Sequence, residues 1–293
     1  MQRITRDHTN CLFSRELAPV ATVESGEELV FETWDAAGGR LKTEADALSL
    51  FLKPEQANPA SGPVFVRGAQ TGDTLAVDIL SIKLAPRGHS RIKPGAGVII
   101  SELKPPVARL IPIDNGEAIF SPTIRFPVRP MVGVIGVAPA GEAVASYYPG
   151  PHGGNMDIND VAAGARLHLP VAVAGALLAI GDVHASMGDG ELTGGGIDIP
   201  AEVTVRVEVL KGWQRPRPWL ETPDLWVTIG NAPALADAIR QATSDMATLL
   251  AEKLAISREE AFILIGARGD ARPGQCAELG MDATARVAFP RLR

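Results

Sequence analysis

The sequence has few of the features that mark secreted, membrane-spanning or disulfide-rich proteins. Its 293 residues include two cysteines, Cys11 and Cys276, so the chain is not a disulfide scaffold and suits a reducing compartment. The N-terminus lacks the apolar segment of a signal peptide. The longest apolar run, 169–180, is shorter than the roughly 20 residues of a membrane helix. We therefore expect a cytoplasmic protein with no membrane partner.

Signs of nucleic-acid binding, phosphate binding and nucleophilic catalysis are also missing. The formal net charge is −6 and the basic residues are scattered, which argues against a nucleic-acid partner. No G-x-x-x-x-G-K-[ST] loop or G-x-G-x-x-G pattern occurs, and 184–188 resembles a nucleophile elbow only superficially. Without a visible nucleophile, a water molecule activated by a metal or a carboxylate is the simplest catalyst.

Glycine and proline are abundant, and valine-rich alternating segments recur between them. The 30 glycines and 23 prolines predict many short strands joined by tight turns. Residues 18–34 and 60–84 each combine a short strand, a turn and a longer strand, and 201–212 alternates most clearly. We expect a mainly β fold whose N-terminal part, 1–140, is a β-sandwich or barrel, followed by a β-rich region, 141–212, that carries the site motifs.

The C-terminal part, 213–293, changes character. Helical three-and-four spacing predicts an amphipathic helix over 233–255. A Ser257–Glu260 capping box predicts a second helix over about 258–267, and 283–289 is expected to be a closing strand. This smaller α+β region should cover a sheet or form a contact between subunits, and we expect a homo-oligomer.

Histidine, acidic residues and glycine turns gather in 149–200. Asp182 and His184 are two residues apart in an expected strand, so they project from one face and are a suitable ligand pair for a divalent ion such as zinc. Other polar residues beside nearby glycine turns could join them: Asn155, Asp157, Asp160, Asp189 and Glu191. The alternative is that these side chains cap their own turns. Upstream, Glu32 and Asp35 lie either at an exposed strand end or in a cleft.

Six segments resemble the acetamidase/formamidase family and recur in the family's order. They are PVATV and FETWDA in 19–36, ASGPVFVRGAQTGDTLAVDIL in 60–80, GVIGVAP in 133–139, PGPHGGNMDIND in 149–160, GDVHASMGDGE in 181–191 and IPAEVTVRVEV in 199–209. The resemblance implies a β-rich fold and hydrolysis of a small linear amide to a carboxylate and ammonia. It also implies a divalent metal, zinc in the first place and calcium as the alternative.

The matching motifs also imply roles for individual residues. The metal ligands would be Asp157, Asp182 and His184, with Asp189 as a further ligand. The catalytic carboxylates would be Glu32, Asp35 and Glu191, of which Glu32 or Glu191 would carry the proton to the leaving ammonia. The substrate and its oxyanion would contact His152, Gly153, Gly154 and Asn155.

Two departures from the family pattern bear on the substrate. Met187 stands where glutamine is expected, and 193–198 has TGGGID where a form like SGTAIE is usual. These changes permit a larger or cyclic amide as an alternative substrate. A second alternative, from another functional class, is a non-catalytic β-sandwich that binds a small ligand or a cation.

Overall fold

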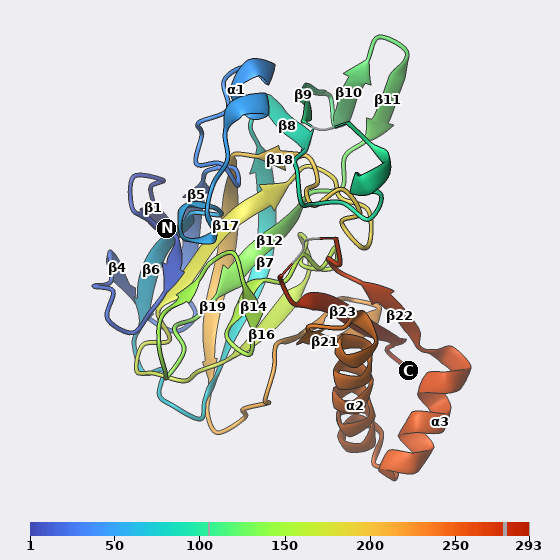
Figure 1. The fold of residues 1–293 in the computed structure, drawn as a ribbon. Coiled ribbons are helices and arrows are strands. Elements are labelled where there is room, and N and C mark those ends of the chain that lie inside the picture. The colour runs from blue at the N-terminus through green and yellow to red at the C-terminus, as the bar shows by residue number, and fades with distance from the viewer. Residues whose placement is uncertain (105, 278–279, 293) are drawn as a thin grey trace.

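The computed structural model describes residues 1–104, 106–277 and 280–292. In this part of the chain, two large sheets face each other (Figure 1). The first has nine strands in the order β1 (Gln2–Ile4), β5 (Glu28–Thr33), β19 (Ala201–Leu210), β7 (Thr74–Leu84), β16 (Arg166–Pro170), β20 (Trp219–Glu221), β21 (Leu225–Ala232), β23 (Ala283–Pro290) and β22 (Asp270–Pro273).

The second sheet has twelve strands and holds most of the polar residues of interest. Its main path is β11 (Ile124–Pro127), β10 (Glu117–Ser121), β9 (Val107–Asp114), β8 (Arg87–Ile92), β18 (Asp198–Ile199), β17 (Leu178–His184), β12 (Met131–Gly136), β15 (Gly153–Asn155) and β14 (Pro149–Gly150). β6 (Ala60–Val66) pairs with β17, β2 (Thr9–Asn10) and β4 (Ala21–Val23). β3 (Leu12–Phe13) and β13 (Val144–Ala145) form a separate two-stranded sheet.

The core lies between the two large sheets. In β19 the valines of one face, such as Val203 and Val205, are fully buried, whereas Thr204 and Arg206 of the other face are not. The buried valines pack with apolar side chains of the second sheet, including Val132 and Ile180. Each such side chain contributes roughly 1.5–3 kcal/mol relative to an exposed one. The predicted mainly β, sandwich-like architecture is confirmed.

Strands from 1–140 and 141–212 alternate within both sheets, so these two chain ranges share one core. In the first sheet, β19 lies between β5 and β7, and β16 lies on the other side of β7. In the second, β17 lies between β6 and β12. The strands of 213–293 then extend the nine-stranded sheet.

The C-terminal helices lie at the end of that extension (Figure 1). α2 (Leu235–Leu254) packs its apolar face on β21 and β23, and α3 (Arg258–Arg268) follows it. Ser257 Oγ accepts from Glu260 N at 3.1 Å, and Glu260 Oε2 accepts from Ser257 N at 2.9 Å, which completes the capping box. Both predicted helices and the closing strand are confirmed, and α2 covers a sheet as expected.

The remaining helical segments are short. They are α1 (Glu44–Ser49) and the 3₁₀ turns η1 (Pro54–Gln56) and η2 (Ile100–Glu102). Among the described helices, none is both long enough and apolar enough to cross a membrane.

Candidate functional site

β17 brings Asp182 and His184 together, as their spacing predicts. His184 Nε2 lies 3.5 Å from Asp182 Oδ1, and both side chains are at most 4% exposed. The strand is hydrogen-bonded to neighbours on both sides, so the pair is fixed by the middle of a sheet rather than by a loop. Side chains held on such a frame keep a defined geometry.

A carboxylate that the sequence did not predict as a ligand completes this side of the histidine. Asp198, in β18, is paired with His184 across the sheet, and its Oδ1 lies 3.3 Å from His184 Nε2. On its other side, Asp198 Oδ2 lies 3.8 Å from Nδ1 of the buried His89. Asp198 closes the TGGGID segment, but only the pairing of β18 with β17 reveals its role.

Two further carboxylates approach from the other side of the imidazole. Asp157 Oδ1 lies 3.9 Å from His184 Nδ1. Potential ligand atoms of Asp157, His184 and Glu191 lie within 4.8 Å of one another, as do those of Asp182, His184 and Asp198. The two groups share His184. We call these five residues the carboxylate–histidine cluster.

The backbone around this cluster is unusual. Eight described residues other than glycine have a positive φ, and four of them are at the site: Asn58 (+50°), Asp157 (+49°), Asp182 (+46°) and Glu191 (+46°). Such conformations are disfavoured for residues with a Cβ and collect at functional sites, where surrounding structure holds them.

The neighbouring strand and the C-terminal region supply that support. Gly133 of β12 leaves room for the cluster, because an ideal Cβ there would lie 2.5 Å from Asp157 Oδ1. Gly190, next to Glu191, donates to Gly274 O at 2.8 Å and accepts from Cys276 N at 3.1 Å. Thr284 Oγ1 donates to Met156 O at 2.7 Å, next to Asp157. Gly274, Cys276 and Thr284 of the C-terminal region therefore help to place two of the four carboxylates.

The chemistry of the cluster suits a cation. Several of its buried polar atoms have no hydrogen-bond partner among the described residues: both oxygens of Asp157, Asp182 Oδ1, His184 Nδ1 and Asp198 Oδ1. Burial, reinforced by the Asp182 and Asp198 carboxylates, raises the pKa of Asp157 to about 7. Buried polar atoms are rarely left unpaired, and four carboxylates around one imidazole repel one another when they ionise. A divalent metal ion would give these buried atoms a partner and neutralise the charge of the ionised carboxylates.

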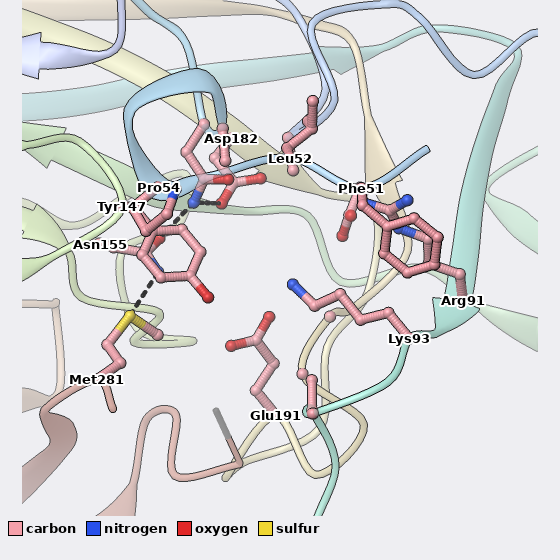
Figure 2. Close-up of a pocket in the computed structure, with 18 of the residues that line it drawn as sticks. Phe51, Leu52, Pro54, Arg91, Lys93, Tyr147, Asn155, Asp182, Glu191 and Met281 are labelled. Atoms are coloured by element: carbon pink, nitrogen blue, oxygen red, sulfur yellow. Dashed lines mark hydrogen bonds between the residues drawn. The ribbon is translucent and has the colours of Figure 1, made fainter. Parts of the chain in front are cut away.

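Four residues of the cluster, Asp182, His184, Glu191 and Asp198, line a cavity of about 200 Å³ (Figure 2). The rest of the lining comes from the segment after α1, from β8 and the loop after it, from the connection between β13 and β14, and from the C-terminal region; its residues include Phe51, Leu52, Arg91, Lys93, Tyr147 and Met281. Figure 2 shows the Glu191 carboxylate, the Lys93 ammonium and the Tyr147 hydroxyl pointing into the same space. Pockets for drug-sized ligands measure about 300–1,000 Å³, so this cavity suits a smaller molecule.

Several predicted site residues lie outside the cavity lining. Glu32 is paired with Arg3 at 2.8 Å and with Arg6 at 3.7 Å. Asp189 accepts from Asn159 Nδ2 at 2.9 Å and from Arg272 Nη1 at 3.1 Å, and it is in neither group of potential metal ligands. Both carboxylates therefore have partners that hold them away from the cluster.

Asp35 and His89 lie behind the cluster. Asp35 Oδ1 accepts from Ala37 N at 2.9 Å and Gly39 N at 3.1 Å, and it lies 3.7 Å from His89 Nε2. Because His89 in turn approaches Asp198, Asp35 supports the site indirectly. No pattern in the sequence around His89 pointed to this position.

Residues 152–155, the HGGN segment, include one residue that lines the cavity and three that do not. Asn155 lines the cavity, where its Oδ1 accepts from Asn58 Nδ2 at 3.1 Å. His152 points elsewhere and packs edge-on against Phe13, with ring centroids 5.1 Å apart. Gly153 and Gly154 form β15 between β12 and β14, in backbone conformations with φ of +97° and +78°. Their glycine identity is thus explained by strand packing.

The two departures from the family pattern lie differently with respect to the cavity. Met187 is 3% exposed and is not among the lining residues. In the TGGGID segment, Gly194 and Gly195 line the cavity. An ideal Cβ at Gly196 would lie 3.1 Å from His184 Cγ, so this glycine lets the histidine ring pack closely.

Comparison with known proteins relates most of the chain to one family. The sequence profile of the acetamidase/formamidase family matches residues 3–149 and 140–223. Among solved structures, the acetamidase of Bacillus halodurans is 39% identical with a TM-score of 0.93, covering 98% of this chain and 97% of its own. A predicted acetamidase/formamidase of Thermoanaerobacter tengcongensis is 37% identical with a TM-score of 0.94, covering 99% and 95%.

Curated relatives match over a shorter span. The acetamidase of Mycolicibacterium smegmatis is 26% identical over 264 residues, covering 67% of this chain and 64% of its own length. The chain spans between 61% and 64% of the length of the curated relatives it matches.

Proposed function

This chain belongs to the acetamidase/formamidase family, and from that premise we propose that it hydrolyses small linear amides to a carboxylate and ammonia. The observation that carries the proposal is the carboxylate–histidine cluster, which has unpartnered buried polar atoms and contributes four residues to the lining of a cavity of about 200 Å³. A cavity of that size favours a short aliphatic amide over the larger or cyclic amide that the sequence left open.

The cluster would hold one divalent ion through Asp182, His184 and Asp198, with Asp157 at the other nitrogen of the same imidazole. A divalent ion supplies Lewis acidity, which polarises an amide carbonyl and makes water acidic enough to lose a proton near pH 7. We propose zinc rather than calcium, because an imidazole ligand suits zinc, whereas calcium prefers oxygen ligands alone.

The chain's own groups would bind the amide and move the proton. Glu191 is the carboxylate that Figure 2 shows facing the cavity, which supports it over Glu32 as the proton carrier to the leaving nitrogen. Asn155 and Tyr147 line the same space and would orient the amide by hydrogen bonds. His152, Gly153 and Gly154 would support β15 rather than bind the oxyanion.

The test combines metal analysis with turnover. We expect purified protein to contain stoichiometric zinc and to release ammonia from formamide, acetamide or propionamide. Asp182→Asn should lose both properties, whereas Asp114→Asn, an equivalent change at an exposed position next to a hairpin turn, should keep them. Protein that binds no zinc and stays inert towards all three amides after zinc is added would refute the proposal and favour a non-catalytic binding protein.

We also propose that the chain forms a homo-oligomer. α3 leaves Phe262 61% exposed and Ile263 71% exposed, and adjacent exposed apolar side chains are typical of contact surfaces. Light scattering should give a mass that is a multiple of one chain; the mass of a single chain would contradict this.

A further inference from the structure

One residue outside the carboxylate–histidine cluster contacts it directly. Asn58, which follows η1, is 6% exposed and lines the cavity. Its Nδ2 donates to Asp182 Oδ2 at 2.9 Å and to Asn155 Oδ1 at 3.1 Å. Both hydrogens of the amide group are therefore used at the site, one on a cluster carboxylate and one on a cavity-lining side chain.

The backbone of Asn58 is fixed on both sides of the side chain. Its N–H donates to Ala36 O at 2.9 Å, and its carbonyl accepts from Ser146 Oγ at 2.6 Å. Its φ of +50° lies in the left-handed region, which asparagine tolerates better than most residues with a Cβ. The segment before β6 thus delivers an amide donor to the cluster from a rigid position.

The hydrogen bond from Asn58 fixes the orientation of the Asp182 carboxylate. The hydrogen bond occupies Asp182 Oδ2, and the other oxygen, Oδ1, has no hydrogen-bond partner among the described residues and lies 3.5 Å from His184 Nε2. A carboxylate held by one oxygen presents the other in a single direction. A donor in this place also stabilises negative charge on Asp182 without adding a competing ligand.

We propose that Asn58 is a positioning residue for the metal site, which holds Asp182 by one carboxylate oxygen so that the other is presented to the cation. The inference rests on the proposed function, because it needs the cluster to bind a metal ion. Groups that orient metal ligands through hydrogen bonds typically change metal affinity by about 10- to 100-fold when they are removed.

Asn58→Gly is the main test, because glycine keeps the left-handed backbone and both backbone hydrogen bonds while it removes the amide. Asn115→Gly is the matched control, since Asn115 has the same φ of +50° in the exposed turn between β9 and β10. The dissociation constant of Zn²⁺ would be measured by competition with a chromogenic chelator. We expect it to rise about 10- to 100-fold in Asn58→Gly and to stay unchanged in Asn115→Gly.

Asn58→Asp separates the donor from the shape of the side chain. Aspartate fits the same space and tolerates the same backbone, but it turns a donor on Asp182 into a second carboxylate. We expect Zn²⁺ binding at pH 8 to be weakened at least as much as in Asn58→Gly, and the kcat for acetamide to fall in both variants with saturating zinc.

Three results separate the possibilities. Wild-type affinity in folded Asn58→Gly, or wild-type or tighter binding in Asn58→Asp, would overturn the role of Asn58. A lower melting temperature with an unchanged Zn²⁺ dissociation constant would also overturn it, because that pattern belongs to a structural residue. Failure of the wild-type protein to bind Zn²⁺ would instead refute the proposed function on which the role depends.

Discussion

Replacing Gly133 with alanine should disable the site through one added methyl group. Gly133 lies in β12 between the pairs Val132–Val183 and Val134–Gly181, so it is opposite Asp182. An ideal Cβ there would lie 2.5 Å from Asp157 Oδ1 and 2.8 Å from the carbonyl oxygen of Asp182. Non-bonded heavy atoms pack best at roughly 3.5–4 Å, so the Asp157 carboxylate must move by about 1 Å.

The size of the effect follows from that displacement. A misplacement of about 1 Å at a reactive centre costs about 100-fold in rate, which corresponds to about 3 kcal/mol of transition-state stabilisation. We therefore expect kcat/KM for acetamide to fall about 100-fold in Gly133→Ala, and the affinity for zinc to fall at least about 10-fold. The contact with the Asp182 carbonyl oxygen also requires a small shift between β12 and β17, so urea unfolding must show that the variant remains folded.

Gly141→Ala is the matched control for this prediction. An ideal Cβ at Gly141 would meet no atom within 4 Å, and its φ is not in the left-handed region. Zinc affinity, amide turnover and urea unfolding would be measured for both variants. Folded Gly133→Ala with wild-type zinc affinity and turnover would refute the packing argument, and an equal loss in Gly141→Ala would show that the effect is not specific to the site.

Three further predictions test the placement of individual side chains. Burial lowers the pKa of His152 from 6.5 to about 4, so between these pH values the unfolded chain binds a proton that the folded chain does not. As the pH drops from 7 to 4, the free energy of unfolding should therefore fall by about 3 kcal/mol more in the wild type than in His152→Gln. Urea unfolding at a series of pH values measures this difference. Asp198→Asn should weaken zinc binding by at least about 10-fold in a chelator competition, whereas Asp189→Asn should not. Glu191→Gln should lower kcat for acetamide by about 100-fold or more, whereas Glu32→Gln should leave it near the wild-type value in an ammonia-release assay.

For each of these three predictions, one experimental result would contradict the proposed placement of the side chain. Parallel stability curves for wild type and His152→Gln, against an exposed control such as His8→Gln, would show that His152 is not buried in its neutral form. Equal zinc loss in both aspartate variants would return Asp189 to the ligand set. Turnover that depends on Glu32 and not on Glu191 would reverse the proposed proton carrier.

The local parts of the fold could be predicted from the sequence because they follow from burial patterns of neighbouring residues. Strict alternation identified β19, and three-and-four spacing with a capping box identified α2 and α3. Strand order could not be predicted in this way. β19 pairs with β5 over a separation of about 170 residues, and nothing in either strand specifies the other beyond its alternating pattern.

The same division applies to the site. Asp182 and His184 were found because a spacing of two residues in a strand places them on one face. Asp198 and Asn58 were missed, because their contacts with β17 depend on sheet pairing and on a buried loop. Asp189 was expected as a further ligand because it lies in a glycine turn soon after His184 and in a motif shared with the family, whereas in the structure its carboxylate is hydrogen-bonded to Asn159 and Arg272. Proximity along the chain is a weak guide at a glycine turn, where the direction of the backbone reverses.

The C-terminal region shows why such a site needs a large protein around it. Asp157 and Glu191 have left-handed backbones and lie in connections rather than in long strands, so local hydrogen bonds alone would not hold them. The segment around β22 and β23 holds the two connections through Gly190, Gly274 and Thr284. That segment is in turn fixed by α2, which buries its apolar face on β21 and β23. Packing of α2 should therefore matter to the cluster although none of its side chains lines the cavity, because it stabilises the strands that keep two carboxylates in a strained, closely spaced arrangement.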